Sequence, residues 1–84
     1  MRDEQLDIPV TIQTEQTGRY LTVTRTAQAA SFLVERWPVQ NRGPKYRSAL
    51  KAMMDVMEQR KTVSAARKAF VGAAKEAGVF VRED

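Results

Sequence analysis

The chain has 84 residues, of which 43% are hydrophobic and 29% are charged, and it contains neither Cys nor His. This length and ordinary composition predict a single small domain, residues 1–84, with an ordered core at about residues 7–82, and they exclude a wholly disordered protein. The absence of Cys and His excludes a disulfide framework, a thiolate metal site and a Ser-His-Asp triad.

The net charge of +4 is unevenly distributed. Residues 25–51 carry six basic side chains against the acidic Glu35, which gives this segment a charge of +5. Such a cluster can contact phosphates or an acidic partner, although a solvated face is the ordinary alternative. The candidate contact residues are Arg36, Arg42, Lys45, Arg47 and Lys51. No segment approaches the roughly 18 apolar residues of a membrane span, so we expect a cytoplasmic protein without a membrane partner.

The N-terminal segment predicts a β-hairpin. Ile8, Val10 and Ile12 alternate with polar residues, which is the period of a half-buried strand. Gly18 ends a polar break and can supply a positive φ, and the run RYLTVT after it is rich in β-branched and aromatic residues. Pro9 lacks an amide donor, so we expect its position at an edge of the sheet.

A first helix is predicted over about residues 26–37, with Thr24 or Thr26 as its N-cap. Its apolar residues recur at helical spacing: Ala29, Phe32, Leu33 and Trp37. Pro38 disfavours helical geometry at the residue before it, so this helix should end near Trp37.

A second helix should begin close to Pro44, because proline suits the first helical position, and should end at about residues 59–61. Its apolar stripe is formed by Tyr46, Leu50, Met53, Met54 and Met57.

A third helix should be capped by Thr62 or Ser64 and end at Gly78, a natural left-handed C-cap. Its core face would consist of Ala66, Phe70, Ala73, Ala74 and Ala77. Residues 79–81 then form a short extended run, which can add a strand to the hairpin or lie across the helices.

This order of elements, β-β-α-α-α with a C-terminal β, predicts an α+β fold in which an N-terminal hairpin is followed by three helices packed on one face of a small sheet. The residues expected in its core include Phe32, Leu33, Trp37, Tyr46, Leu50, Met53, Met54, Met57, Phe70 and Ala74. The edges of so small a sheet invite pairing with a second copy.

Catalytic groups are hard to find in this chain. Ser31, Ser48 and Ser64 have no visible activating base, and Asp55 and Glu58, one helical turn apart, are an ordinary pair of solvated carboxylates. We therefore expect no enzymatic activity, no cofactor and no metal.

Several segments follow one another in a recognisable order: an early Pro-Val strand, an Ala-rich helix ending ERWP, then RGPKYRSALKAMMDVM and ARKAFVGAAKEAGVFV. Their most characteristic residues are Trp37, Pro38, Gly43, Tyr46, Ala49, Phe70, Ala74 and Gly78. From about Ile8 to Val81 the chain resembles the family catalogued as domain of unknown function 982, small proteins of rhizobia and related alphaproteobacteria. The resemblance implies a bacterial protein and no established activity.

The expected function is a non-catalytic accessory or protein-interaction module, with a second copy or another protein as partner, that uses a sheet edge or a helix face. The alternative is weak nucleic-acid binding through residues 36–51. In that alternative the bases neutralise phosphates and Trp37 and Tyr46 stack on nucleobases, whereas the competing interpretation of both rings is burial in the core.

Overall fold

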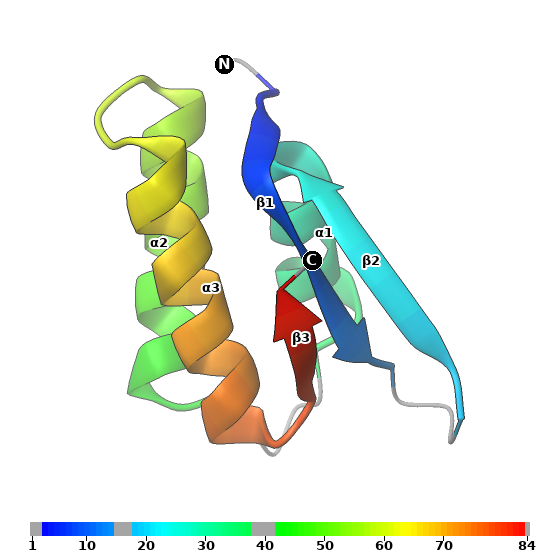
Figure 1. Cartoon of the computed structure of the whole chain (residues 1–84). Helices are drawn as coiled ribbons and strands as arrows, with labels where there is room; N and C mark the ends of the chain where they lie inside the picture. Colours follow the sequence, from blue (N-terminus) through cyan, green and yellow to red (C-terminus); the bar gives the residue numbers. More distant parts are fainter. Residues whose placement is uncertain (1–2, 15–17, 38–41, 84) are drawn as a thin grey trace.

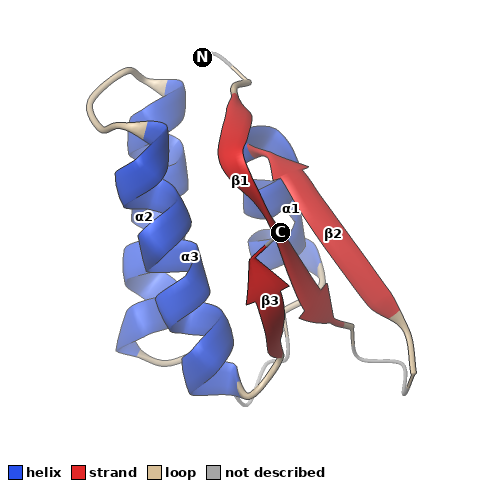
Figure 2. Cartoon of the chain, in the orientation of Figure 1, coloured by secondary structure: helices blue, strands red, loops and turns tan. Residues whose placement is uncertain are grey.

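The computed structural model describes residues 3–14, 18–37 and 42–83, and within these ranges the chain forms three strands and three helices (Figure 1). In chain order they are β1 (Gln5–Gln13), β2 (Tyr20–Arg25), α1 (Thr26–Glu35), α2 (Pro44–Met57), α3 (Val63–Ala77) and β3 (Phe80–Glu83). The fold is α+β, as the sequence predicts: α1 lies behind the sheet, and α2 and α3 pack side by side next to it (Figure 2). No helix in the described part has both the length and the apolar character that a membrane crossing requires.

The described strands form an antiparallel sheet in the order β2-β1-β3. Val10 pairs with Val23 and Ile12 with Leu21, so the alternating apolar residues of the hairpin share the inner face of the sheet. The C-terminal run joins this sheet as β3, with Phe80 opposite Ile12, and does not lie across the helices. The N-terminal strand β1 therefore pairs with the C-terminal strand β3.

We expected Pro9 at an edge of the sheet, but β1, the strand that contains it, is the central one of the described strands. Gln5 pairs with Arg25 and Val10 with Val23, so residues 6–9 of β1 lie opposite Thr24 alone in an irregular stretch. On the other side of β1, the residues paired with β3 are Val10, Thr11 and Ile12, so this ladder stops one residue after Pro9. Pro9 thus lies where the ladder is interrupted, which is where a residue without an N–H is tolerated.

The N-terminus of α1 is capped from a distant part of the chain, so the expected Thr cap is wrong. Its N-cap is Arg25, which makes no side-chain capping bond. Instead the carboxylate of Asp3 accepts a hydrogen bond from the N–H of Ala27 at 3.0 Å, and the hydroxyl of Thr26 accepts one from the N–H of Glu4 at 2.9 Å. Hydrogen bonds from the Arg25 side chain and from Ala27 hold the pKa of the Asp3 carboxyl below its ordinary value.

The boundaries of α2 and α3 follow local sequence signals more closely. Pro44 is the first residue of α2, as expected, but the helix ends at Met57 because Gln59 takes a positive φ of 63°. Thr62 caps α3 by accepting a hydrogen bond from the N–H of Ala65 at 3.1 Å. Gly78 ends α3 in the left-handed region, at a φ of 74°, as its position predicts.

The core is centred on Trp37, which is 2% exposed. Its ring lies 5.8 Å from that of Phe32, 5.9 Å from that of Tyr46 and 6.0 Å from that of Phe70, measured between centroids. Besides these four aromatic residues, the expected core residues that are buried are Leu33, Met53, Met57 and Ala74. The three helices α1, α2 and α3 therefore share one aromatic cluster.

The prediction that Met54 belongs to the core is wrong, because this residue is 40% exposed. Leu50, also expected in the core, is half-buried at its border. The reason is that α2 packs on two sides: beside the methionines, its small residues Ala49 and Ala52 are buried as well. The buried arc of α2 is thus shifted away from Met54, which lies about 100° round the helix from the buried Met53.

Candidate interaction surface on α2

The five candidate bases do not form one patch. Arg36 lies just after α1, with its guanidinium carbon 5.4 Å from the centroid of the Phe32 ring. Lys45 lies at the start of α2 and its stem approaches α3, since a Cβ placed on Gly72 would stand 3.9 Å from the Cδ of Lys45. Arg47 and Lys51, one turn apart, are exposed on α2.

Arg42 is a structural residue. Its Nη2 donates to the carbonyl of Trp37 at 3.2 Å and to that of Val34 at 3.5 Å, which places a cation at the C-terminal end of α1. The guanidinium also lies 5.3 Å from the centroid of the Tyr46 ring. Its Nε–H is buried and has no acceptor among the described residues, so this group is turned into the protein rather than towards a ligand.

The aromatic residues beside these bases are not available for stacking. Trp37 is buried in the cluster, and Tyr46 is 8% exposed, with its hydroxyl donating to the carbonyl of Leu33 at 2.7 Å. The prediction that both rings belong to the core is therefore confirmed. Phosphate contact through residues 36–51 would depend on exposed bases alone.

Three exposed residues of α2 and the exposed C-cap residue that follows it are spaced at i, i+4, i+7 and i+11, which places them on one face of the helix. We call this set, Arg47, Lys51, Met54 and Glu58, the α2 outer stripe. Its two ends are basic and acidic, and its apolar centre is Met54, with Leu50 half-buried beside it. Within the chain, Lys51 pairs with Asp55 at 3.1 Å and Glu58 with Arg60 at 3.3 Å. The expectation that Asp55 is solvated is wrong, because this residue is buried beside Lys51.

The charges of the stripe run against the macrodipole of α2. A helix is stabilised by acidic groups at its N-terminus and basic groups at its C-terminus, but α2 has no acidic residue in its first turn and no basic residue in its last. The carboxylate that does lie at its N-terminus is that of Glu76 on α3, because a Cβ on Gly43 would stand 2.9 Å from Glu76 Oε1. The basic and acidic ends of the stripe therefore do nothing for the stability of their own helix.

The outer edge of β2 is partly closed by α1. The side-chain amide of Gln28 accepts a hydrogen bond from the N–H of Thr24 at 2.9 Å and donates one to the carbonyl of Thr22 at 3.4 Å. These backbone groups would otherwise be open to strand addition. The sequence gives no indication of this contact, because Gln28 is an ordinary polar residue within the predicted first helix.

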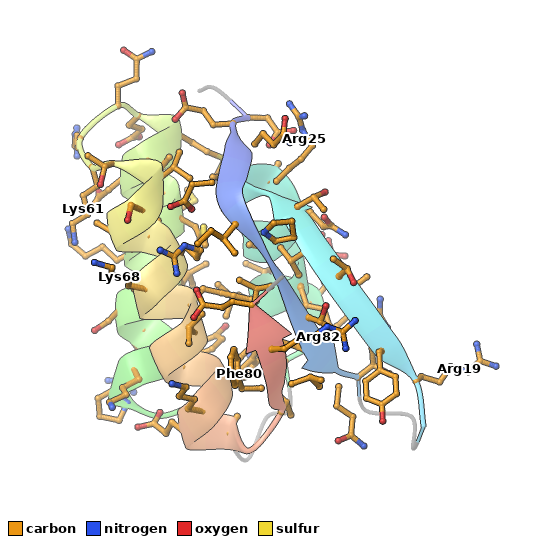
Figure 3. All side chains as sticks on the ribbon, in the orientation of Figure 1. Arg19, Arg25, Lys61, Lys68, Phe80 and Arg82 are labelled. Atoms are coloured by element: carbon orange, nitrogen blue, oxygen red, sulfur yellow. The ribbon has the colours of Figure 1, made fainter. Side chains whose placement is uncertain are left out.

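At the other end of the sheet, Arg67 of α3 binds side chains of β1 and β3. This residue was not identified from the sequence. Its side chain is buried, its Nε donates to Asp7 Oδ1 on β1 at 2.9 Å, and its Nη1 donates to Glu83 on β3. Figure 3 shows Phe80 on the α3 side of β3 and Arg82 on the other side, next to β1. In addition, the ammonium of Lys75 lies 5.1 Å from the centroid of the Phe80 ring.

The Arg67 pairs shift the ionisation of their members. Partial burial raises the pKa of the Asp7 carboxyl, but the hydrogen bond and positive charge of Arg67 outweigh it and hold this pKa below its ordinary value. The hydrogen bond to Asp7 and the charges of both carboxylates raise the pKa of the Arg67 guanidinium, in spite of its burial. From the sequence alone, Arg67 would be placed on the polar, exposed face of α3, whereas in the structure it is buried.

The described part of the chain contains no pocket and no group of three or more acidic side chains that could hold a metal ion. Searches of curated proteins and of solved structures find no match. A family model described as "Protein of unknown function (DUF982)" matches residues 8–81, nearly the whole chain. The chain therefore belongs to the DUF982 family.

Proposed function

We propose that this protein is a non-catalytic interaction module of the bacterial cytoplasm that binds a protein partner through the α2 outer stripe. The observation that carries the proposal is the exposure of Met54, 40%, between basic residues on one side and Glu58 on the other. An apolar centre bordered by charges is the usual anatomy of a protein interface.

The internal roles of other polar residues support the same choice of surface. Arg42 binds carbonyls at the end of α1, Arg67 binds carboxylates of the sheet, and Gln28 closes part of the β2 edge. Arg47 and Lys51, by contrast, are exposed on the outer side of α2, although Lys51 also pairs with the buried carboxylate of Asp55.

Site-specific photo-cross-linking tests this proposal. A photoreactive residue replaces Met54 in one variant and Ala65, an exposed residue of α3, in a matched control. Irradiation in the producing bacterium should give a protein adduct at position 54 that the control lacks, and Arg47→Glu should weaken it. Equal labelling at both positions, or adducts at position 54 to nucleic acid alone, would refute the proposal.

A further inference from the structure

We propose that the partner of the α2 outer stripe is a second copy of this chain, bound so that its α2 runs antiparallel to the first. This inference rests on the proposed function and goes further by naming the occupant and its orientation. Its basis is the distribution of charge along the stripe.

The stripe is complementary to itself when it is turned through 180°. Its basic end holds Arg47 and its acidic end Glu58, eleven residues apart, which is about 16 Å along the helix. A two-fold axis at the middle of the stripe places Arg47 of each copy opposite Glu58 of the other and Lys51 opposite Met54. An isologous contact of this kind is closed, so the assembly stops at two copies.

The parallel arrangement is disfavoured by the same charges. It would place Arg47 beside Arg47 and Glu58 beside Glu58, and it would align the two helix dipoles. In the antiparallel arrangement, the basic N-terminal part of each α2 meets the negative C-terminal end of the other. The charges that oppose the dipole of their own helix thus complement the dipole of the second copy, which gives them a role that the isolated chain does not.

The apolar centre of this contact is small. It consists of Met54, the exposed part of Leu50 and the aliphatic stem of Lys51, and methionine adapts to such surfaces. The intrachain pair Glu58–Arg60 is exposed and can be exchanged for a pair across the interface at little cost. Lys51 can keep its pair with the buried carboxylate of Asp55, because it lies opposite Met54 in this arrangement. A contact of this size predicts a reversible dimer that forms in the micromolar range or above.

The test uses two charge reversals, Arg47→Glu and Glu58→Arg, and sedimentation equilibrium over a concentration series. Each variant alone brings like charges together at both ends of the interface, and we expect its dimer dissociation constant to rise about tenfold or more. When the two variants are mixed, both ends regain opposite charges, so a heterodimer should form. The double variant R47E/E58R should recover the wild-type dimer for the same reason.

Controls separate loss of the interface from loss of the fold. Both reversals place charges that suit the dipole of α2, so helical circular dichroism and thermal midpoint of the monomers should not fall. Lys68→Glu, an equal charge change on an exposed residue of α3 (Figure 3), should leave the dissociation constant unchanged. A second readout is disulfide formation: in this Cys-free chain, a mixture of Lys51→Cys and Met54→Cys should cross-link mainly between unlike copies.

Several outcomes would overturn the inference. A wild-type protein that is strictly monomeric at high micromolar concentration would exclude the second copy as occupant. A wild-type dimer that withstands both reversals, or whose variants fail to complement each other when mixed, would exclude the antiparallel arrangement. If the photo-cross-linker at position 54 captures a different protein while the isolated chain is monomeric, the proposed function stands and this inference fails.

Discussion

Replacing Trp37 with Ala should unfold a large fraction of the molecules near physiological temperature. The indole is 2% exposed and contacts the rings of Phe32, Tyr46 and Phe70, which come from α1, α2 and α3. No other side chain in the described part of the chain joins three aromatic partners in this way. The substitution therefore removes the centre of the core rather than one of its borders.

The magnitude follows from the burial. Truncation of a buried Trp to Ala costs about 3–5 kcal/mol, through lost transfer free energy and the cavity that remains. Edge-to-face aromatic pairs of the kind made with Phe32 and Phe70 place the expected value in the upper part of that range. A domain of 84 residues has a free energy of unfolding of roughly 4–13 kcal/mol, so the loss is between about a third and all of it.

The assay is urea denaturation followed by far-ultraviolet circular dichroism, because Trp37 is the single Trp and its fluorescence disappears with the substitution. Tyr20→Ala is the matched control, since this aromatic residue is 62% exposed and its loss should change the free energy of unfolding by less than about 0.5 kcal/mol. If Trp37→Ala shifted the midpoint no more than Tyr20→Ala does, the aromatic cluster would not be the centre of the core.

Three further predictions concern charged residues. Arg67→Met should lower the free energy of unfolding by about 1–3 kcal/mol, less than for a fully buried pair because Asp7 and Glu83 keep 38% and 32% of their side-chain exposure; an unchanged urea midpoint would contradict this. The pKa of Asp7 is depressed in the folded state, so its contribution to stability is present above the ordinary value of 3.8 and is lost as the pH falls through the folded value. Unfolding curves from pH 6 to 2.5 should therefore show a shallower acid-side loss for Asp7→Asn than for wild type, and equal slopes would refute the assignment. Arg42→Ala should cost about 1–2 kcal/mol through the exposed end of α1, whereas Arg47→Ala should stay within about 0.5 kcal/mol in the same urea assay; equal effects would contradict the separation of structural from surface bases.

Local signals in the sequence were sufficient for most of the fold. Pro44 marks the start of α2, Thr62 caps α3 and Gly78 ends it, because each acts within one turn of its own position. The family resemblance over nearly the whole chain is likewise confirmed by the family model. What local signals do not contain is a partner that lies far along the chain, such as Asp3 at the N-terminus of α1.

The same limitation applies to the candidate site. Arg42 and Arg47 are indistinguishable as members of a basic segment, but in the fold one binds carbonyls at the end of α1 and the other lies on the surface. Met54 fits the apolar stripe of α2 as well as Met53 does, and its exposure follows from α2 packing on two sides at once. Spacing along one helix cannot show how many neighbours that helix has.

The direction of the α2 charges links the fold to the proposed function. If the outer stripe were merely a solvated face, nothing would favour Arg47 near the N-terminus of α2 and Glu58 at its C-terminal end, since each opposes the helix dipole by a few tenths of a kcal/mol. An antiparallel second copy converts both oppositions into attractions and covers Met54 at the same time. Sedimentation of a mixture of the Arg47→Glu and Glu58→Arg variants distinguishes these explanations. Heterodimers should form if the two stripes meet, whereas on a solvated face the charge of a second molecule would have no effect on association.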